Sequence, residues 1–133
     1  MNIKQIMIVE DSPIMRVILG NIISGDPHLM IVEYANDGKD ALLKLTNVKP
    51  DLIILDLEMP NMDGITFLQN VKAKSNAKIM VITGALNNSP KINQAKMLGA
   101  QVVITKPSGV VSPDLKEKKG QEIKHTIYRI LGI

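Results

Sequence analysis

Side chains that could carry out chemistry lie at or shortly after the ends of short apolar runs in this 133-residue chain. They are Glu10, Asp11, Asp56, Thr83 and Lys106. The runs have the length of buried β-strands, and the carboxyl ends of parallel strands meet at one edge of a sheet. We therefore expect three carboxylates, one hydroxyl and one ammonium group to lie close together, although they are far apart in the sequence.

This set of groups suits a magnesium-dependent phosphoryl transfer. Carboxylates within a few ångströms of one another repel unless a cation lies among them. Mg²⁺ takes a few protein oxygens and shares its other positions with water or a phosphoryl group. Lys106 and Thr83 could each hold a phosphate oxygen. Asp56 stands alone after its strand and could attack as a carboxylate nucleophile, becoming an aspartyl phosphate.

Each of these residues also has an ordinary structural interpretation. Glu10 and Asp11 could be acidic residues at a helix N-terminus, and Asp56 could be a turn aspartate. Thr83 and Lys106 are common residue types beyond the ends of strands. The structural interpretation needs the right functional group after four separate strands by coincidence, so we favour a shared site.

Five short apolar runs alternate with stretches of helical period. This pattern predicts an α/β fold with a doubly wound, largely parallel sheet of five strands and five helices. The expected strands are residues 5–9, 30–34, 52–55, 79–82 and 101–104. The first, third and fourth are almost wholly apolar, as strands covered on both faces must be. The second contains Glu33 and Tyr34 and is expected nearer an edge of the sheet.

Apolar residues at intervals of three and four, with cap and stop signals, predict the helices. The expected helices are residues 13–24, 38–47, 64–74, 90–98 and about 113–131. Asp37, Asp63 and Ser89 are the expected N-caps of the second, third and fourth helices, and Gly120 should weaken the first half of the last helix. The chain shows no repeat or linker, so residues 1–133 are expected to form one domain.

Composition excludes several classes of function. Cysteine is absent, which rules out disulfides, thiol catalysis and cysteine-ligated zinc. His28 and His125 lie far apart and have no partner at metal-ligand spacing. The sequence contains neither an apolar run of membrane-spanning length nor a signal peptide, so we expect a cytoplasmic protein. The net charge is +3, but one Phe, two Tyr and no Trp offer little for stacking on bases, so direct nucleic-acid binding is not expected.

From about residue 4 to its C-terminus, the sequence resembles the receiver domains of two-component response regulators. The matching segments are VEDS at 9–12 with MR at 15–16, NDGKDAL at 36–42, PDLIILD at 50–56, EMPNMDG at 58–64, LGA at 98–100 and TKP at 105–107. The central segment around Asp56 is highly specific. The resemblance implies a flavodoxin-like sheet in the order 2-1-3-4-5.

The same resemblance implies a role for each acidic candidate. Asp56 would be the phosphoacceptor. Glu10, Asp11 and the backbone carbonyl of Glu58 would complete a Mg²⁺ site with it.

The resemblance also implies roles for residues nearer the C-terminus. Thr83 would be the switch hydroxyl, and Lys106 would contact the phosphate, with a cis peptide bond before Pro107. Receiver domains often carry an aromatic residue three positions before this lysine, whereas this chain has Val103.

The resemblance implies a phosphorylation-activated switch in place of an enzyme that turns over a substrate. A histidine kinase would pass its phosphoryl group to Asp56, and the surface of the fourth helix, fifth strand and fifth helix would change to regulate an output protein or domain. Such a domain could also take a phosphoryl group from small donors and dephosphorylate itself.

One loop is more specific within the family. The segments TKPSG at 105–109 and VSPDL at 111–115 resemble the receiver half of chemotaxis methylesterases. No catalytic esterase domain follows in this sequence, so we expect either a separate receiver or a piece of a longer protein.

Two other classes of protein are weighed against the receiver. A haloacid-dehalogenase-type phosphohydrolase also uses an aspartyl nucleophile and Mg²⁺, but it usually places a second Asp two residues later, where this chain has Glu58. A flavin-binding module on the same fold needs a glycine- and hydroxyl-rich phosphate loop after the first strand. Glu10 and Asp11 would repel that phosphate.

Overall fold

Five parallel strands form a sheet in the order β2-β1-β3-β4-β5. The computed structural model describes residues 2–84, 89–106 and 113–133, with the backbone alone described at 105 and 113–118. The strands are β1 Lys4–Val9, β2 Leu29–Ala35, β3 Leu52–Leu55, β4 Lys78–Thr83 and β5 Val102–Thr105. This order confirms the expected flavodoxin-like fold and the edge position of the second strand.

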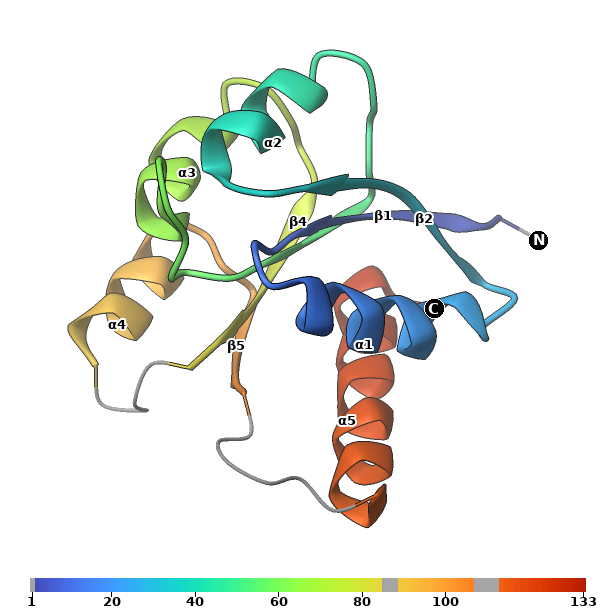
Figure 1. Cartoon of the computed structure of the whole chain (residues 1–133). Helices are drawn as coiled ribbons and strands as arrows, with labels where there is room; N and C mark the ends of the chain where they lie inside the picture. Colours follow the sequence, from blue (N-terminus) through green and yellow to red (C-terminus); the bar gives the residue numbers. More distant parts are fainter. Residues whose placement is uncertain (1, 85–88, 107–112) are drawn as a thin grey trace.

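Helices cover both faces of the sheet (Figure 1). They are α1 Pro13–Ser24, α2 Gly38–Lys44, α3 Gly64–Val71, α4 Pro90–Met97 and α5 Pro113–Leu131. α1 and α5 pack on one face, and α2, α3 and α4 pack on the other. Among the helices of the described chain, none combines the length and the apolar character that crossing a membrane requires.

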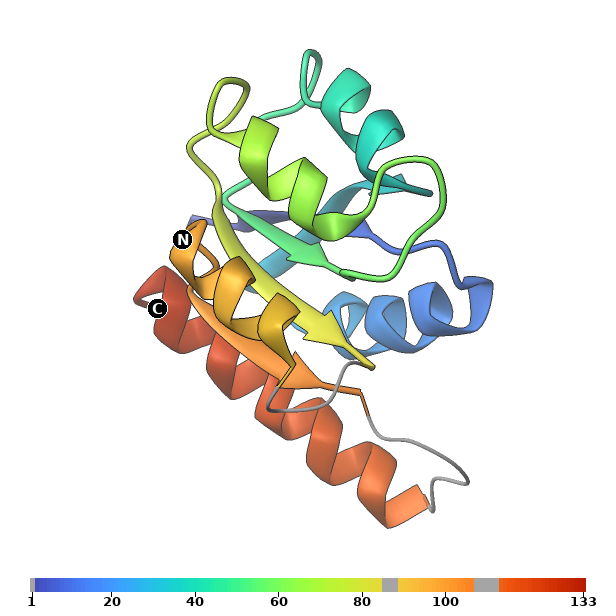
Figure 2. The same cartoon turned by 90° about the vertical axis from the view of Figure 1, so that its left-hand side faces the viewer.

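The alternation of side chains along each strand divides the core into two layers. Ile6 and Ile8 of β1 pack with α1 and α5, whereas Met7 and Val9 pack with α2, α3 and α4. Successive residues of a strand point to opposite faces, so a strand covered on both sides must be apolar throughout. The arrowheads of β3, β4 and β5 point to the same end of the molecule (Figure 2), which brings the residues after these strands to one rim.

The predicted helix starts are confirmed. Asp37, Asp63 and Ser89 each accept a hydrogen bond from a backbone N–H in the first turn of their helix. α2 and α3 end three residues earlier than expected. After each helix, a backbone N–H bonds to the carbonyl three residues earlier instead of four, which forms a turn in place of α-helix. Thr46 N donates to Leu43 O, and Lys74 N donates to Val71 O.

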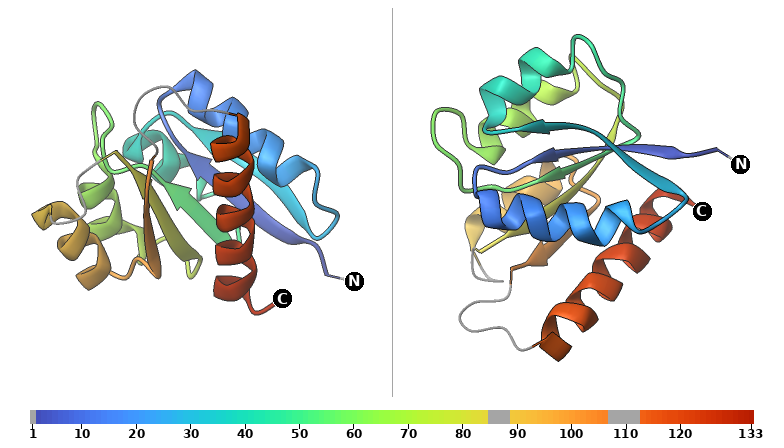
Figure 3. Two further views of the ribbon diagram at one scale, coloured as in Figure 1. Left: turned by 90° about the horizontal axis from the view of Figure 1, so that it is seen from below. Right: turned by 45° about the vertical axis from the view of Figure 1, so that its right-hand side comes forward.

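Gly120 lies within α5, which continues through this position, and the weakening that its helix propensity predicts stays a prediction. The residue is buried, and a Cβ placed on it would lie 3.5 Å from Cγ1 of Ile22 in α1. α5 lies beside α1 on the same face of the sheet (Figure 3). Gly120 therefore lies where α5 packs against α1.

The pairing of the edge strand is irregular. Ile6 of β1 pairs with Ile31 of β2, but the next residue, Met7, pairs with Glu33. The register therefore skips Val32, which forms a bulge in β2.

Candidate functional site

The carboxyl ends of β1 and β3 bring three carboxylates together. Glu10 and Asp11 follow β1 and Asp56 follows β3, and one ligand oxygen from each lies within 4.8 Å of the others. The backbone holds these positions, since Asp56 N donates to Val9 O at 3.0 Å and Glu10 N donates to Ala35 O at 3.0 Å. Because β1 and β3 are neighbours in the sheet, Asp56 lies close to Glu10 and Asp11, although it is more than forty residues away in the sequence.

Lys106 lies between two of these carboxylates. Its Nζ is 3.0 Å from Glu10 Oε2 and 3.1 Å from Asp56 Oδ2. Glu10 is 2% exposed and Asp56 is 4% exposed, so both ion pairs are largely screened from water. The backbone N–H of Lys106 donates to the backbone carbonyl of Thr83 at 2.6 Å, and this hydrogen bond joins the end of β5 to the end of β4.

Burial and neighbouring charges shift the pKa values of Glu10 and Lys106. Burial and the charge of Asp56 raise the pKa of Glu10 to about 7, although hydrogen bonds from Lys106 and the Ser12 N–H act in the opposite direction. Burial opposes the charge of Lys106, but its hydrogen bonds and ion pairs with the two carboxylates outweigh burial and raise its pKa.

The donor set fits a divalent cation. Counted as formal charges, three carboxylates and one ammonium group give the cluster −2. Carboxylate oxygens are the ligands that Mg²⁺ prefers, and the ion is usually held by one or two of them together with water and phosphate. The residues present therefore suit Mg²⁺, whose charge would offset both causes of the raised pKa of Glu10, burial first and then the charge of Asp56.

Thr83 and Glu58 lie at the same rim. Thr83 is the last residue of β4, is fully buried, and pairs in register with Thr105 of β5. The Glu58 N–H donates to Asp56 Oδ1 at 3.2 Å. The role of the Glu58 carbonyl as a metal ligand stays a prediction, and the expected cis bond at Pro107 lies outside the described residues.

Two contacts near the site were not predicted from the sequence. The Glu58 side chain is exposed and pairs with Lys91 of α4, whose Nζ lies 3.3 Å from Oε1 and 3.4 Å from Oε2. Asn61, with φ of 64°, donates from Nδ2 to Asp37 Oδ2 at 2.7 Å. Neither contact follows from periodicity, although the tolerance of asparagine for positive φ was a signal for the turn at Asn61.

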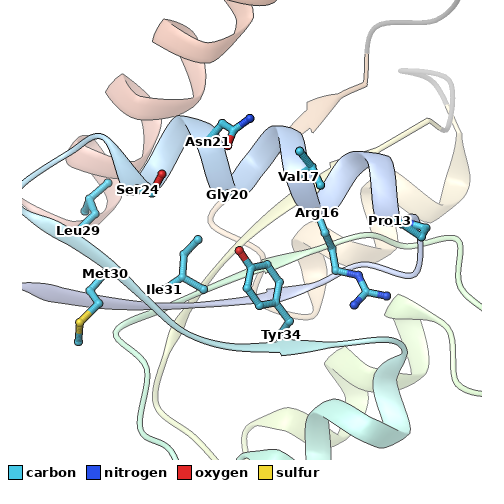
Figure 4. Close-up of a pocket in the computed structure, with 10 residues that line it drawn as sticks. All are labelled: Pro13, Arg16, Val17, Gly20, Asn21, Ser24, Leu29, Met30, Ile31 and Tyr34. Carbon is cyan, nitrogen blue, oxygen red and sulfur yellow. The ribbon is translucent and has the colours of Figure 1, made fainter.

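A pocket of about 900 Å³ lies away from the carboxylates, between α1 and β2 (Figure 4). The Tyr34 side chain rises from β2 with its hydroxyl toward Gly20 of α1. The guanidinium of Arg16 donates to Asn36 Oδ1 beside it. None of the described residues that line this pocket is acidic, so cation-dependent chemistry belongs to the carboxylate cluster.

The chain is similar to known proteins over most of its length. Residues 6–116 match the family model of the response regulator receiver domain. A protein-glutamate methylesterase/protein-glutamine glutaminase from Treponema denticola is 43% identical over 114 residues, which are 84% of this chain and 30% of that protein. The chain thus spans about a third of the length of the curated relatives it matches.

Solved structures agree with the family model. The response regulator domain of Thermotoga maritima CheB has a TM-score of 0.88 and 29% identity, covering 99% of this chain and 98% of that chain. A chain in the crystal structure of the P1 domain of CheA3 in complex with CheY6 from R. sphaeroides has a TM-score of 0.80 and 36% identity, covering 100% of both chains. The matched sequence and the shared fold show that this chain belongs to the response regulator receiver domain family.

Proposed function

We propose that residues 1–133 form one receiver domain that is switched by phosphorylation of Asp56. The observation that carries the proposal is the setting of this carboxylate. Asp56 is buried directly after the end of β3, and its Oδ2 lies 3.1 Å from Nζ of Lys106. It belongs to the same carboxylate cluster as Glu10 and Asp11. An oxygen nucleophile beside a cation and a set of metal ligands is suited to receive a phosphoryl group.

The transfer would proceed by displacement at phosphorus. A carboxylate oxygen of Asp56 forms the new O–P bond while the N–P bond of a phosphohistidine breaks, and the departing imidazole takes up a proton. Lys106 would hold a phosphoryl oxygen. Mg²⁺, held by the carboxylates of Glu10, Asp11 and Asp56 and by the carbonyl of Glu58, would neutralise charge on the transferring group.

The switch would pass from the phosphoryl group to the end of β4 and then to α4. Thr83 lies at this end, and its carbonyl accepts from the Lys106 N–H, so a new charge on Asp56 would act on both strands. Val103 of β5 packs partly buried against the core layer under α2, α3 and α4. Since valine has one dominant rotamer, we expect altered packing at Val103 and no swing between buried and exposed positions.

The partners belong to the same proposal. The likeness to a methylesterase and to a chain solved with a CheA3 domain supports chemotaxis-type signalling in the cytoplasm, with a histidine kinase as donor. The output would be a protein or domain that contacts the surface of α4, β5 and α5.

The phosphohydrolase alternative is not favoured. Such an enzyme needs an acid/base two residues after its nucleophile, at the position of Glu58. This carboxylate lies at the surface in an ion pair with Lys91. Residues 6–116 of this chain also match the family model of the receiver domain.

Intact mass spectrometry tests the acceptor. After incubation with acetyl phosphate and Mg²⁺, the wild type should gain one phosphoryl group and Asp56→Asn should gain none. Asp40→Asn is the matched control, because Asp40 lies on α2 and pairs with Lys44 away from the cluster. Equal labelling of the Asp56 variant and the wild type would show that another residue accepts the group.

A further inference from the structure

A pocket of about 770 Å³ lies at the amino ends of the strands, opposite the carboxylate rim. Lysines from separate parts of the chain line it. Lys4 begins β1, Lys78 begins β4, Lys49 precedes β3, and Lys72 and Lys74 follow α3. The start of β1 and the end of α5 lie at this end of the molecule (Figure 3).

The charge of this pocket, which we call the lysine pocket, is strongly one-sided. Asp51 is the one acidic residue among the described residues that line it, and its Oδ2 accepts a hydrogen bond from Gln5 N at 2.7 Å. Five ammonium groups and one carboxylate give the pocket a formal charge of +4, which exceeds the +3 of the whole chain. The basic character of the protein is thus concentrated at one end.

Contacts that stabilise the fold explain the positions of only some of the five lysines in this pocket. Lys78 Nζ donates to Ile130 O at 3.0 Å and so satisfies a carbonyl near the end of α5. Lys72 and Lys74 follow the C-terminus of α3, where a positive charge is favourable. Lys4 and Lys49 have no ion pair within the described part of the chain, and neither lies in the last turn of a helix. Their addition to the cluster raises its repulsion, which a bound anion would relieve.

We propose that the lysine pocket binds an acidic segment of a partner protein. The lysine ammonium groups can pair with carboxylates as point charges, and the aromatic rings on which nucleic-acid bases stack are missing from the described lining. Apolar residues such as Val48, Ala77 and Leu131 also line the pocket and can contact the stems of Glu or Asp side chains.

Two other occupants fit the shape less well. An anionic membrane offers a broad surface, whereas these lysines surround a concavity. A second copy of this chain would have to present its own acid cluster, but two of its three carboxylates, Glu10 and Asp56, are recessed at 2% and 4% exposure and only Asp11 is exposed. Two recessed surfaces cannot make close contact. A flexible acidic segment can enter the pocket.

The lysine pocket does not depend on the proposed function, because it lies at the other end of the sheet from Asp56. The test is fluorescence anisotropy with a labelled deca-glutamate peptide at low and physiological salt. Lys49→Glu/Lys74→Glu is the pocket variant. Lys39→Glu/Lys91→Glu is the control with the same net charge, since these exposed lysines begin α2 and α4 at the opposite end of the sheet.

The pocket variant should weaken binding at least tenfold and the control less than threefold. Asp56→Asn should bind like the wild type, which separates this site from the phosphorylation site. A milder pair, Lys49→Gln/Lys74→Gln, should still weaken binding if the charge-reversed protein does not fold. Equal loss in pocket and control variants, or tighter binding of a ten-nucleotide oligothymidylate or of vesicles rich in phosphatidylglycerol, would overturn the proposal.

Discussion

Glu10 is a buried carboxylate whose ionisation the fold opposes. Its pKa rises from an ordinary 4.5 to about 7 through burial and the neighbouring Asp56 charge. Between these pH values the folded protein binds more protons than the unfolded chain does. This group therefore lowers the free energy of unfolding of the metal-free protein as the pH rises from about 4.5 to 7.

Replacing Glu10 with an uncharged residue should change how the free energy of unfolding depends on pH. Glu10→Gln should gain stability over the wild type across this window, by on the order of 2 to 3 kcal/mol at pH 8 relative to pH 4.5. Urea unfolding in EDTA at several pH values measures the difference. Glu58→Gln, at an exposed position in the loop between β3 and α3, should show no such trend. If the free energy of unfolding differed between Glu10→Gln and the wild type by the same amount at every pH, the raised pKa of Glu10 would not be the cause.

At the scale of elements, the start of α3 fixes the loop that carries Asp56. Gly64 is buried there, and an added Cβ would lie 2.6 Å from Leu57 Cα and 2.7 Å from Asp56 O. Since both neighbours are backbone atoms, Gly64→Ala must displace the loop. We expect a loss of about 1 to 3 kcal/mol of stability and slower phosphorylation of Asp56.

Denaturant unfolding and acetyl phosphate labelling together check this prediction. Gly25→Ala is the control, because the nearest atom to its added Cβ is Asn21 O at 4.0 Å. If Gly64→Ala were as stable and as reactive as Gly25→Ala, the loop would not be fixed by this contact.

A second element-scale contact ties α5 to the turn between α1 and β2. The Tyr128 hydroxyl donates to Asp26 Oδ2, and Asp26 Oδ1 accepts from His28 N at 2.8 Å. Burial disfavours the Asp26 charge, but these hydrogen bonds outweigh it and lower its pKa. The hydrogen bond to Asp26 also raises the pKa of Tyr128.

Tyr128→Phe should therefore cost about 1 to 2 kcal/mol near pH 7. The cost should shrink as the pH falls below 3.8, the ordinary pKa at which Asp26 of the unfolded chain takes up its proton, and toward the lower pKa of the folded protein. It should also shrink as the pH rises above 10, where the Tyr128 hydroxyl of the unfolded wild type ionises. Thermal unfolding across this range is the measurement. Tyr34→Phe serves as the control, and a cost independent of pH would exclude the pair with Asp26.

The elements and the acid rim could be read from the sequence because each depends on local pattern. Apolar runs gave the strands, cap residues gave the helix starts at Asp37, Asp63 and Ser89, and strand ends located the carboxylates. The Lys91–Glu58 pair and the Tyr128–Asp26 contact depend on how helices cross the sheet. No sequence period encodes that geometry, so these contacts required the structure.

At the scale of the whole molecule, the acid cluster links cation binding to global stability. Glu10, Asp11 and Asp56 repel in the metal-free protein, so a ligand that relieves the repulsion favours the folded state. Mg²⁺ at ten times its dissociation constant should add about 1.4 kcal/mol. The melting temperature should rise by a few degrees.

Asp11→Asn should separate the two effects. The variant should melt at or slightly above the wild type without Mg²⁺, because one repelling charge is gone and Asp11 is exposed. It should lose the melting shift that Mg²⁺ causes. Differential scanning calorimetry with and without Mg²⁺ provides the comparison, and a full Mg²⁺ response in the variant would remove Asp11 from the site. Asp40→Asn should respond like the wild type.

The two edges of the sheet bear on how the protein behaves at high concentration. β2 forms one edge and bulges at Val32, and β5 forms the other edge and has four residues. A bulged or short edge is a poor template for a strand from another molecule. Folded stocks should therefore resist fibril growth by strand addition, and aggregation during storage should start from unfolded chains and slow whenever the fold is stabilised.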